Sequence, residues 1–249
     1  MDGRSVLVTG ASRGIGRATA LAFARNGDRV AVHHRDSEPL ARQVVAELPG
    51  SGHTVVRGDL ADPEEAQAVV EAAVSALGGL EVLVNNAGVS LLHDLTEMDF
   101  DQWRAAFDRT VAVNLNGAAY VTYFAVRHML VGGGSIVNVS SRGAFRGEPG
   151  QPGYGASKAA LNAFGQSLAV ALAPHGISVA TVAPGWVATD MSNEELKRPR
   201  GSEILAQSPF HRIAQPEEVA AAIVFLASDQ AKFASGSILD VNGASYLRT

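Results

Sequence analysis

Short apolar runs alternate along the chain with longer stretches in which apolar residues recur every three or four positions. The runs are rich in β-branched residues and nearly continuous, as in strands that are buried on both faces. They cover Ser5–Thr9, Arg29–His33, Thr54–Arg57, Glu81–Val84, Ser135–Val139, Ser178–Val182 and Ile238–Val241. The alanine-rich stretches between them predict helices over Gly14–Asn26, Glu38–Leu48, Pro63–Leu77, Asp101–Leu130, Tyr154–Ala173 and Pro216–Ser228. This alternation predicts a parallel sheet covered by helices on both faces.

Local signals mark several ends of these helices. Asp62-Pro63-Glu64-Glu65 combines a cap residue, a proline at the first helical position and two acids, which favours a helix start. Asn26-Gly27 and His175-Gly176 provide residues that tolerate the left-handed conformation at a helix end. Since no linker, repeat or low-complexity tract interrupts the pattern, we expect one domain over residues 1–249.

Residues 190–212 break the rhythm. They carry little apolar periodicity and include the basic stretch Lys197-Arg198-Pro199-Arg200. The segment follows the sixth predicted strand, on the side of the sheet where open α/β folds bind ligands. A loop of this length in a compact domain is usually functional or disordered. We interpret it as a substrate lid, with a mobile surface loop as the alternative.

Composition narrows the class of protein. With 249 residues, 47% of them apolar, the chain can bury one large core. The absence of cysteine excludes disulfides and thiol nucleophiles, and the net charge of -5 argues against nonspecific nucleic-acid binding. No signal-peptide pattern or membrane-length apolar run occurs, so we expect a cytoplasmic protein.

A glycine-rich turn, Gly10-Ala11-Ser12-Arg13-Gly14-Ile15-Gly16, joins the first predicted strand to the first helix. Glycines allow the backbone to approach a pyrophosphate, and the helix N-terminus offers free N–H groups and partial positive charge. The spacing is Gly-x-x-x-Gly-x-Gly, which differs from the dinucleotide fingerprint Gly-x-Gly-x-x-Gly. The turn predicts phosphate binding; a simple tight strand-to-helix turn is the alternative.

Tyr154 and Lys158 are four residues apart on a predicted helix, and Ser141 stands thirteen residues before Tyr154. Positions i and i+4 share one helix face, so both side chains can reach one pocket. A nearby cation favours the phenolate and lowers the phenol pKa from about 10. This pattern is typical of a tyrosine that transfers a proton.

The glycine turn, Asn85-Asn86-Ala87-Gly88, Asn114, the Ser141/Tyr154/Lys158 set and Pro184-Gly185 together resemble the classical short-chain dehydrogenases/reductases. The motifs follow the family's order from about Val6 to Tyr246. The pattern, including the stretch Leu239–Ala244, is most similar to 3-oxoacyl-thioester (3-oxoacyl-ACP) reductases. The resemblance implies an α/β fold: a single doubly wound Rossmann domain with a seven-stranded parallel sheet. It also implies an NAD(P)-dependent oxidoreductase acting on CH–OH groups, in most relatives a homotetramer.

The resemblance also implies catalytic roles. Tyr154 would protonate the carbonyl oxygen, and Ser141 would hydrogen-bond that oxygen. Lys158 would hold the nicotinamide ribose and lower the pKa of the phenol, while Asn114 would bind a relay water. Ser140 is the rival of Ser141, but neighbouring strand residues point to opposite faces and the spacing to Tyr154 favours Ser141. A capping or core amide is the alternative role of Asn114.

The same resemblance implies the cofactor contacts. Asp59 and Leu60 would contact the adenine, with a plain surface aspartate as the alternative for Asp59. The adenosine side of the cleft would be formed by Asn86, Ala87 and Gly88. The nicotinamide amide and the phosphates would be covered by Pro184, Gly185, Val187 and Thr189.

The end of the second strand bears on which nicotinamide cofactor is bound. An acid there binds the ribose of NAD, whereas basic residues accept the extra phosphate of NADP. The decisive position is His34, followed by Arg35, and Arg13 points to the same place; guanidinium groups bind phosphate well. NADP (NADPH) is therefore favoured over NAD, with Asp36 as the rival ribose acid. Both His33 and His34 are interpreted as exposed or cofactor-edge residues, and no metal site is expected.

Two departures from the family pattern stand out. The segment from Trp103 to Asn114 is longer than expected by about one helical turn, with the extra residues within Arg104–Thr110. Reductases of acyl carrier protein tend to place Arg or Lys at the helix ends beside the cleft, yet Leu130–Gly134 and Val170–His175 contain neither. Acyl carrier protein therefore stays an open partner, while a small-molecule or thioester-linked ketone remains the expected substrate.

The leading functional prediction is an NADPH-dependent carbonyl reductase that acts on a 3-oxoacyl thioester or a similar ketone. An alcohol, sugar or polyol dehydrogenase working in the oxidative direction is the first alternative, because the same four residues serve both directions. A catalytically silent cofactor-binding sensor is the alternative from another class.

Overall fold

Seven parallel strands form one sheet in the order β3-β2-β1-β4-β5-β6-β7. The computed structural model describes residues 3–190, 192, 196, 197 and 201–248. Its strands are β1 (Ser5–Val8), β2 (Arg29–His34), β3 (Thr54–Arg57), β4 (Val82–Asn85), β5 (Gly134–Val139), β6 (Ile177–Pro184) and β7 (Ile238–Val241). All seven predicted strands are present, so the sheet expected from the apolar runs is confirmed.

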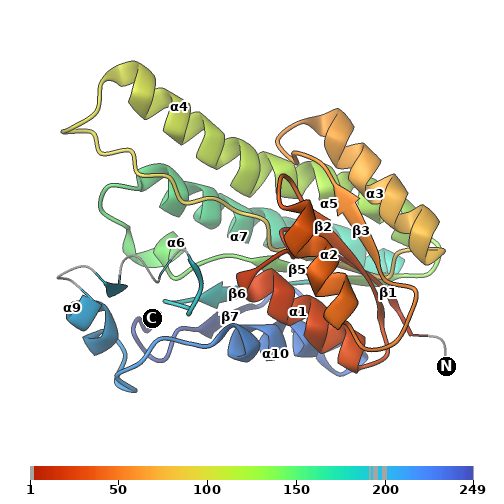
Figure 1. Cartoon of the computed structure of the whole chain (residues 1–249). Coiled ribbons are helices and arrows are strands. Elements are labelled where there is room, and N and C mark those ends of the chain that lie inside the picture. The colour runs from red at the N-terminus through yellow and green to blue at the C-terminus, as the bar shows by residue number, and fades with distance from the viewer. Residues whose placement is uncertain (1–2, 191, 193–195, 198–200, 249) are drawn as a thin grey trace.

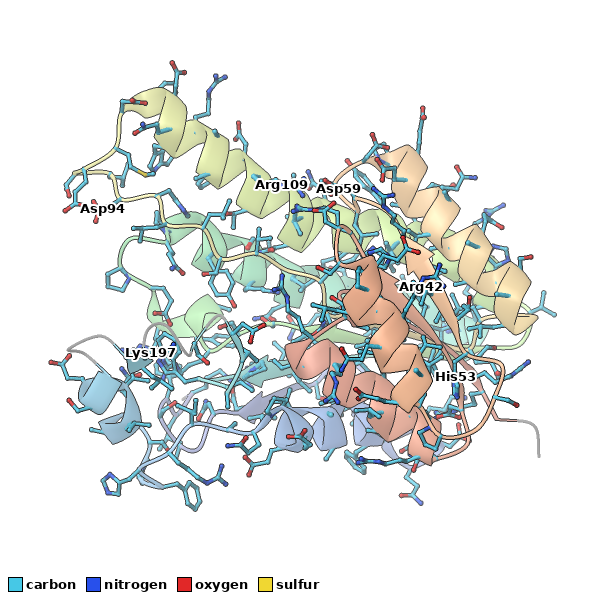
Figure 2. The ribbon with its side chains drawn as sticks, in the orientation of Figure 1. Arg42, His53, Asp59, Asp94, Arg109 and Lys197 are labelled. Atoms are coloured by element: carbon cyan, nitrogen blue, oxygen red, sulfur yellow. The ribbon has the colours of Figure 1, made fainter. Side chains whose placement is uncertain are left out.

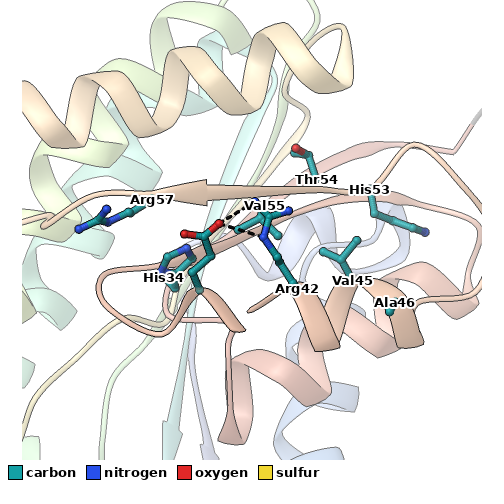
Figure 3. Close-up of a pocket in the computed structure, with 9 residues that line it drawn as sticks. His34, Arg42, Val45, Ala46, His53, Thr54, Val55 and Arg57 are labelled. Carbon is teal, nitrogen blue, oxygen red and sulfur yellow. Dashed lines mark hydrogen bonds and ion pairs between the residues drawn. The ribbon is translucent and has the colours of Figure 1, made fainter. Parts of the chain in front are cut away.

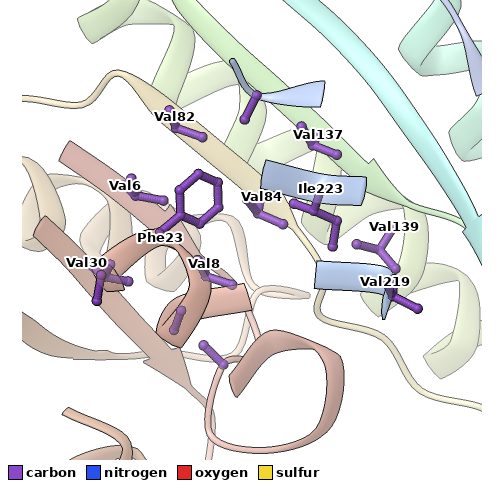
Figure 4. Close-up of a cluster of buried hydrophobic side chains, with 14 of the residues drawn as sticks. Val6, Val8, Phe23, Val30, Val82, Val84, Val137, Val139, Val219 and Ile223 are labelled. Atoms are coloured by element: carbon purple, nitrogen blue, oxygen red, sulfur yellow. The ribbon is translucent and has the colours of Figure 1, made fainter. Parts of the chain in front are cut away.

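Helices cover both faces of the sheet (Figure 1). One face packs against α1 (Gly14–Arg25), α2 (Glu38–Glu47) and α10 (Pro216–Leu226). The other packs against α3 (Pro63–Leu77), α5 (Ala118–Met129) and α7 (Pro152–Leu172). Successive strand residues face opposite sides: Val6 and Val8 lie in the first core, whereas Leu7 lies in the second. In Figure 4 the strand valines of the first core surround Phe23 of α1 and Ile223 of α10.

The predicted helix over 101–130 is three helical segments in direct succession. These are α4 (Phe100–Val111), a π-helical segment η1 (Ala112–Gly117) and α5. Short helices that the sequence pattern did not predict are α6 (Gly143–Arg146), α9 (Gly201–Ala206), η2 (Ala173–His175) and η3 (Asp229–Ala234). The helix that carries Tyr154 begins at Pro152, two residues before the predicted start, so Tyr154 lies in its first turn.

Strands β1 and β4 are neighbours within the sheet. The chain adds strands outward to one side of β1 and then, from β4 on, to the other side, so the strand order reverses between these two. At such a switch point the loops after the two strands separate to opposite faces and leave a crevice beyond their carboxyl ends. The glycine turn follows β1 and the Asn86 loop follows β4, so both lie at this crevice. Among the described residues, no helix combines the length and apolarity needed to cross a bilayer.

Candidate active site

The glycine turn after β1 is tightly packed. Gly10 and Gly14 have φ angles of +63° and +55°, a conformation that side chains disfavour. A Cβ on Gly16 would lie 2.4 Å from the Gly10 carbonyl oxygen and 2.6 Å from Asn86 Nδ2. Asn86 Nδ2 donates to the Thr9 carbonyl oxygen at 2.8 Å and to that of Gly10 at 3.1 Å. Asn86 therefore braces the turn from the neighbouring strand.

The start of α1 is left free for an anion. Its N-cap residue, Arg13, makes no side-chain capping bond, and the first turn holds no acidic residue. The first N–H groups of a helix have no partner within the helix, and together with the helix dipole they favour a phosphate. Ser12 is buried and Ile15 packs against the core. This arrangement fits the pyrophosphate of a dinucleotide.

The Ser141 hydroxyl lies close enough to the Tyr154 phenol to lower its pKa. The Ser141 hydroxyl also accepts the N–H of Gly143 at 3.0 Å. Ser140 points elsewhere, since its buried hydroxyl donates to the Lys158 carbonyl oxygen at 3.2 Å. Of the two serines, only Ser141 therefore faces the tyrosine.

The pKa of Tyr154 is raised in the protein alone. Burial is the largest cause, because it disfavours the phenolate, and the charge of Glu148 acts in the same direction. The nearby Ser141 hydroxyl opposes these effects without overcoming them. In the protein without cofactor the pKa of the phenol is thus raised rather than lowered, and Lys158 is not among the causes of the shift.

Lys158 is buried behind the tyrosine. Its Nζ lies 5.9 Å from the centre of the Tyr154 ring and donates to the Val139 carbonyl oxygen at 2.8 Å. Burial lowers the pKa of Lys158 to about 8. A Cβ on Gly88 would lie 3.3 Å from both Lys158 Nζ and Asn114 Oδ1, so this glycine keeps space open beside them.

Asn114 lies in the π-helical segment and is buried. Its Oδ1 accepts the Val89 N–H at 2.8 Å, and its Nδ2 donates to the Val89 carbonyl oxygen at 2.9 Å. Nδ2 also donates to Ser157 Oγ at 3.2 Å, whose hydroxyl donates to the Tyr154 carbonyl oxygen at 2.8 Å. One-turn π segments often mark functional sites. The four predicted catalytic residues are thus brought to one place.

Basic side chains gather at the end of β2. His34 is buried and lies opposite Arg57 of β3 in the sheet register; Arg57 Nε donates to the Arg35 carbonyl oxygen at 3.3 Å. Arg35 forms an ion pair with Asp36, and Arg13 lies 3.8 Å from Asp190. The pKa of His34 is lowered, first by burial and then by the charge of Arg57, although nearby acids oppose this.

Asp59 is held by an arginine from α4 (Figure 2). Arg109 Nη2 lies 2.8 Å from Asp59 Oδ2 and 3.1 Å from Oδ1. Burial raises the pKa of Asp59, but the bonds from Arg109 and the Ala61 N–H outweigh it, so the pKa is lowered. Leu60 beside it is buried. Asp59 is therefore an oriented, charged acceptor at the end of β3.

The loop after β6 lies across the glycine turn. A Cβ on Gly14 would lie 3.2 Å from Thr189 Cγ2. The Gly185 N–H donates to the Val241 carbonyl oxygen at 3.1 Å, and the Pro184 carbonyl oxygen accepts the Arg142 N–H at 2.8 Å. The Val187 carbonyl oxygen accepts the Ser192 hydroxyl. These bonds fix the loop on one side of the crevice, opposite Asn86, Ala87 and Gly88.

Comparisons with known proteins agree with this geometry. A family model described as enoyl-(acyl carrier protein) reductase matches residues 10–244. An L-rhamnose 1-dehydrogenase (NAD(P)(+)) from Sphingomonas sp. is 40% identical and covers 99% of this chain and 98% of its own. A 3-oxoacyl-[acyl-carrier-protein] reductase FabG from Staphylococcus aureus is 39% identical, covering 98% of each chain. The chain belongs to the short-chain dehydrogenase/reductase family.

Solved structures of this family share the fold. A dehydrogenase/reductase from Sinorhizobium meliloti 1021 has a TM-score of 0.91 at 33% identity and covers 99% of this chain and 96% of its own. A short-chain dehydrogenase/reductase of glucose/ribitol dehydrogenase type from Brucella melitensis has a TM-score of 0.90 at 32% identity, covering 98% and 97%. The protein is thus an NAD(P)-dependent oxidoreductase of the short-chain type that acts on CH–OH groups.

His33 was not predicted as a structural part of this short-chain dehydrogenase/reductase site. Its Nδ1 accepts the Gly10 N–H at 2.9 Å, and its Nε2 bonds to the Gly58 carbonyl oxygen at 3.0 Å. Burial lowers its pKa to about 4, so the ring is neutral at pH 7. The expectation that His33 and His34 are exposed is wrong, since both side chains are buried; their place at the edge of the cofactor stays a prediction. Alternation on β2 alone could not reveal the bond to Gly10.

Arg57 and Glu148 are further residues that the sequence did not single out. Arg57 reaches the end of β2 through strand pairing, and Glu148 reaches Tyr154 through the loop after α6. The predicted lid is only partly described: Asp190, Ser192, Leu196, Lys197 and residues 201–212 have structure, whereas Arg198 and Arg200 lie outside the described residues.

A separate groove of about 560 Å³ lies between α2 and β3. Figure 3 shows His34 and Arg57 at one end and His53 at the other, with Arg42 held over the groove by Glu38. Ser141, Tyr154 and Lys158 are not among the residues that line it, so this groove is separate from the candidate catalytic residues. Within the described ranges, no group of three or more His, Cys, Asp or Glu side chains is placed to hold a metal ion.

Proposed function

We propose that this protein is an NADPH-dependent reductase that converts a ketone into a secondary alcohol, with a 3-oxoacyl thioester as the first candidate substrate. The proposal rests on the neighbouring hydroxyls of Ser141 and Tyr154, beside a buried Lys158 and a free helix N-terminus. Two hydroxyl donors converge at one point, as stabilisation of a developing oxyanion requires.

In the proposed mechanism the bound nicotinamide supplies the hydride. Ser141 and Tyr154 donate hydrogen bonds to the substrate carbonyl oxygen and fix its orientation. Tyr154 then transfers its proton to that oxygen as negative charge develops there. The ammonium of Lys158 stabilises the phenolate that remains, because opposite charges within a few ångströms favour the ionised form.

The proposed roles of Asn114 and Lys158 include proton supply. Asn114 already contacts Ser157 and Val89, and Gly88 leaves space beside Asn114 and Lys158. A water in that space would return a proton to Tyr154 through Lys158. The same residues would run the reaction backwards, with the Tyr154 phenolate as the base.

The preference for NADPH is supported by Arg35 and Arg57 at the end of β2 and by Arg13 in the glycine turn, although Arg35 is paired with Asp36. Guanidinium groups can each make paired bonds to a phosphate. Cofactor contacts are proposed for Gly10, Ser12, Arg13, Gly14, Ile15, Gly16, His34, Arg35, Asp59, Leu60, Asn86, Ala87, Gly88, Tyr154, Lys158, Pro184, Gly185, Val187 and Thr189. We expect kcat/KM to be at least about tenfold higher with NADPH than with NADH, because one charge-assisted hydrogen bond contributes roughly that factor. An equal or higher value with NADH would refute the preference.

Glu148 favours a second candidate, oxidation of a sugar. A Cβ on Gly143 would lie 3.3 Å from Ser141 Oγ and 3.4 Å from Glu148 Oε1, so this carboxylate is close to the proposed reaction centre. A carboxylate is a strong acceptor for hydroxyl groups, which a sugar offers and an acyl chain lacks. The relative that is named L-rhamnose 1-dehydrogenase agrees with this candidate.

A substrate panel distinguishes the two candidates. Acetoacetyl-CoA and ethyl acetoacetate would be tested with NADPH, and L-rhamnose and ribitol with NADP⁺ and NAD⁺. Turnover of the β-keto compounds alone supports the first candidate, and turnover of the sugars alone supports the second. Binding of NADPH without turnover of any compound would favour a cofactor-binding sensor.

The remaining assignments are proposals of the same kind. We infer one catalytic domain over residues 1–249, with residues 190–212 as a lid over the substrate. The ion pair of Asp190 with Arg13 supports contact between the start of this segment and the glycine turn. A homotetramer and a cytoplasmic location are inferred from the family alone.

A further inference from the structure

His93 lies in the loop between β4 and α4, and its side chain is fully buried. Its Nδ1 is 2.7 Å from the Leu91 carbonyl oxygen, and its Nε2 is 2.8 Å from the Gly153 nitrogen. A carbonyl oxygen can only accept and a backbone N–H can only donate. The ring is therefore the neutral tautomer that carries its proton on Nδ1 and accepts the Gly153 N–H at Nε2.

Gly153 is the second residue of α7 and directly precedes Tyr154. The N-cap residue of this helix, Gln151, makes no side-chain capping bond, and Pro152 has no N–H to satisfy. The Gly153 N–H is thus the first unpaired donor of the helix. His93 supplies the missing cap from a loop that is 60 residues away in the sequence.

Aromatic side chains of α4 hold the imidazole in place. The rings of Trp103 and Phe107 lie 6.4 and 6.0 Å from that of His93, in edge-on arrangements. A Cβ on Gly153 would lie 2.8 Å from Phe107 Cδ2 and 2.9 Å from His93 Nε2. The helix start, the imidazole and α4 are therefore packed without space for even a methyl group.

Two more bonds tie the same loop to the start of α7. The His93 N–H donates to the Gly150 carbonyl oxygen at 2.8 Å, and the Ser90 hydroxyl donates to Gln151 Oε1 at 2.5 Å. The adjacent residue Val89 is bonded to Asn114 through both its N–H and its carbonyl oxygen. The loop thus connects Asn114 to the first turn of α7.

We propose that His93 is a positioning residue for Tyr154: by capping Gly153 it fixes the first turn of α7 and with it the phenol relative to Ser141. The inference rests on the proposed role of Tyr154 in proton transfer. A phenol displaced by a fraction of an ångström would still leave the cofactor site intact, because His93 contacts neither the glycine turn nor the end of β2. The effect therefore falls on kcat rather than on cofactor binding.

The test compares His93→Phe, which fills the space without an acceptor, with His93→Gln, which retains one. His128→Phe is the matched control, since His128 lies on α5 and pairs with Glu71. Each variant is measured for NADPH affinity by fluorescence, for hydrogen exchange over residues 150–158, and for kcat and KM on the best substrate of the panel. Gly153→Ala is a second, independent disturbance of the same contact.

For His93→Phe we expect faster exchange at the start of α7 and a kcat lowered by about 10- to 100-fold, with KM and the NADPH Kd changed by less than about threefold. His93→Gln should recover most of kcat, Gly153→Ala should lower it, and His128→Phe should match the wild type. A kcat within about twofold of wild type in folded His93→Phe or Gly153→Ala overturns the proposal. If no substrate is turned over by the wild type, the proposed function fails, while unchanged exchange in His93→Phe would separately refute the cap.

Discussion

At the scale of single residues, buried titratable groups distinguish this site. His33, Tyr154 and Lys158 are all shifted toward their neutral forms, and burial is the largest cause for each. Desolvation disfavours the charged form of any group. Burial therefore raises the pKa of acids such as Tyr154 and lowers the pKa of bases such as His33 and Lys158. The charge that Tyr154 would carry after proton transfer is accordingly left for Lys158 to stabilise.

His33 makes stability depend on pH. Its pKa in the folded protein is about 4, against 6.5 for an exposed histidine, so the unfolded chain binds the proton more tightly. The contribution of His33 to the free energy of unfolding is complete above pH 6.5 and is lost as the pH falls toward 4. Protonation would also remove the acceptor for the Gly10 N–H. We expect a loss of about 3 kcal/mol in the free energy of unfolding over this window, measured by urea denaturation.

The control for this prediction replaces the titrating group. His33→Asn keeps an amide that can accept and donate but cannot take up the proton, so its stability should vary less between pH 6.5 and 4. His175→Asn, at an exposed position of η2, should keep the wild-type dependence. Parallel curves for wild type and His33→Asn would contradict the assignment.

The residues that the sequence could predict were those with a fixed spacing. Tyr154 and Lys158 are four residues apart, so they share one face of the helix wherever the helix lies. Ser141 follows a strand of the parallel sheet, so it lies at the same edge of the sheet as the carboxyl ends of the other strands. His33 and His93 could not be found in this way, because their partners, Gly10 and Gly153, are set by how loops pack. A histidine on an apolar strand carries no signal of the bond it makes across the sheet.

At the scale of elements, the start of a helix could be predicted from the sequence where a side chain caps the backbone. The Asp62 carboxylate accepts the N–H groups of both Glu64 and Glu65 at the start of α3. Ser37 occupies the corresponding place before α2 but makes no capping bond. The two positions form a natural pair for measuring what a cap contributes.

Asp62→Ala should lower the free energy of unfolding by about 1 kcal/mol, because it leaves two N–H groups without their acceptor and removes a negative charge from the positive end of the helix. Ser37→Ala should change it by less than about 0.5 kcal/mol. Both values come from urea denaturation at pH 7. Equal losses in the two variants would show that the Asp62 capping bonds contribute nothing.

The long helical stretch from α4 to α5 shows what the sequence could not predict about an element. Its extent could be predicted from the sequence, and the extra turn within Arg104–Thr110 stays a prediction. The π-helical turn that orients Asn114 could not, since apolar periodicity does not resolve a single wider turn. Nor did the pattern show that α4 places Phe107 against His93 and Arg109 against Asp59.

At the scale of the whole molecule, the strand pattern sufficed for the architecture. Seven apolar runs separated by helices leave few arrangements, since crossovers between parallel strands are right-handed and short. The substrate could not be predicted in the same way, because it is set by a few side chains on loops around a shared scaffold. We propose that Glu148 is one of these, and relatives named for sugar and for acyl substrates are 40% and 39% identical to this chain.

The charge distribution bears on acyl carrier protein as a partner. The last turns of α5 and α7 lack Arg and Lys, apart from Arg127 in α5, and the whole chain has a net charge of -5. Two acidic surfaces repel one another over a Debye length of about 8 Å at physiological salt. In an NMR titration at 150 mM salt, about the physiological value, we expect no saturable shifts in labelled acyl carrier protein. Saturable shifts that disappear at about 1 M salt would instead establish docking.

We propose that the Tyr154 hydroxyl transfers the proton and contributes little to the affinity for NADPH. Tyr154→Phe removes the phenolic hydroxyl and keeps the ring, so the packing against Lys158 is preserved. Turnover and NADPH affinity, measured side by side on the same preparation, should separate: kcat/KM falls by about 100-fold or more, while the NADPH Kd stays within about threefold of wild type. Unchanged turnover in Tyr154→Phe would contradict the claim.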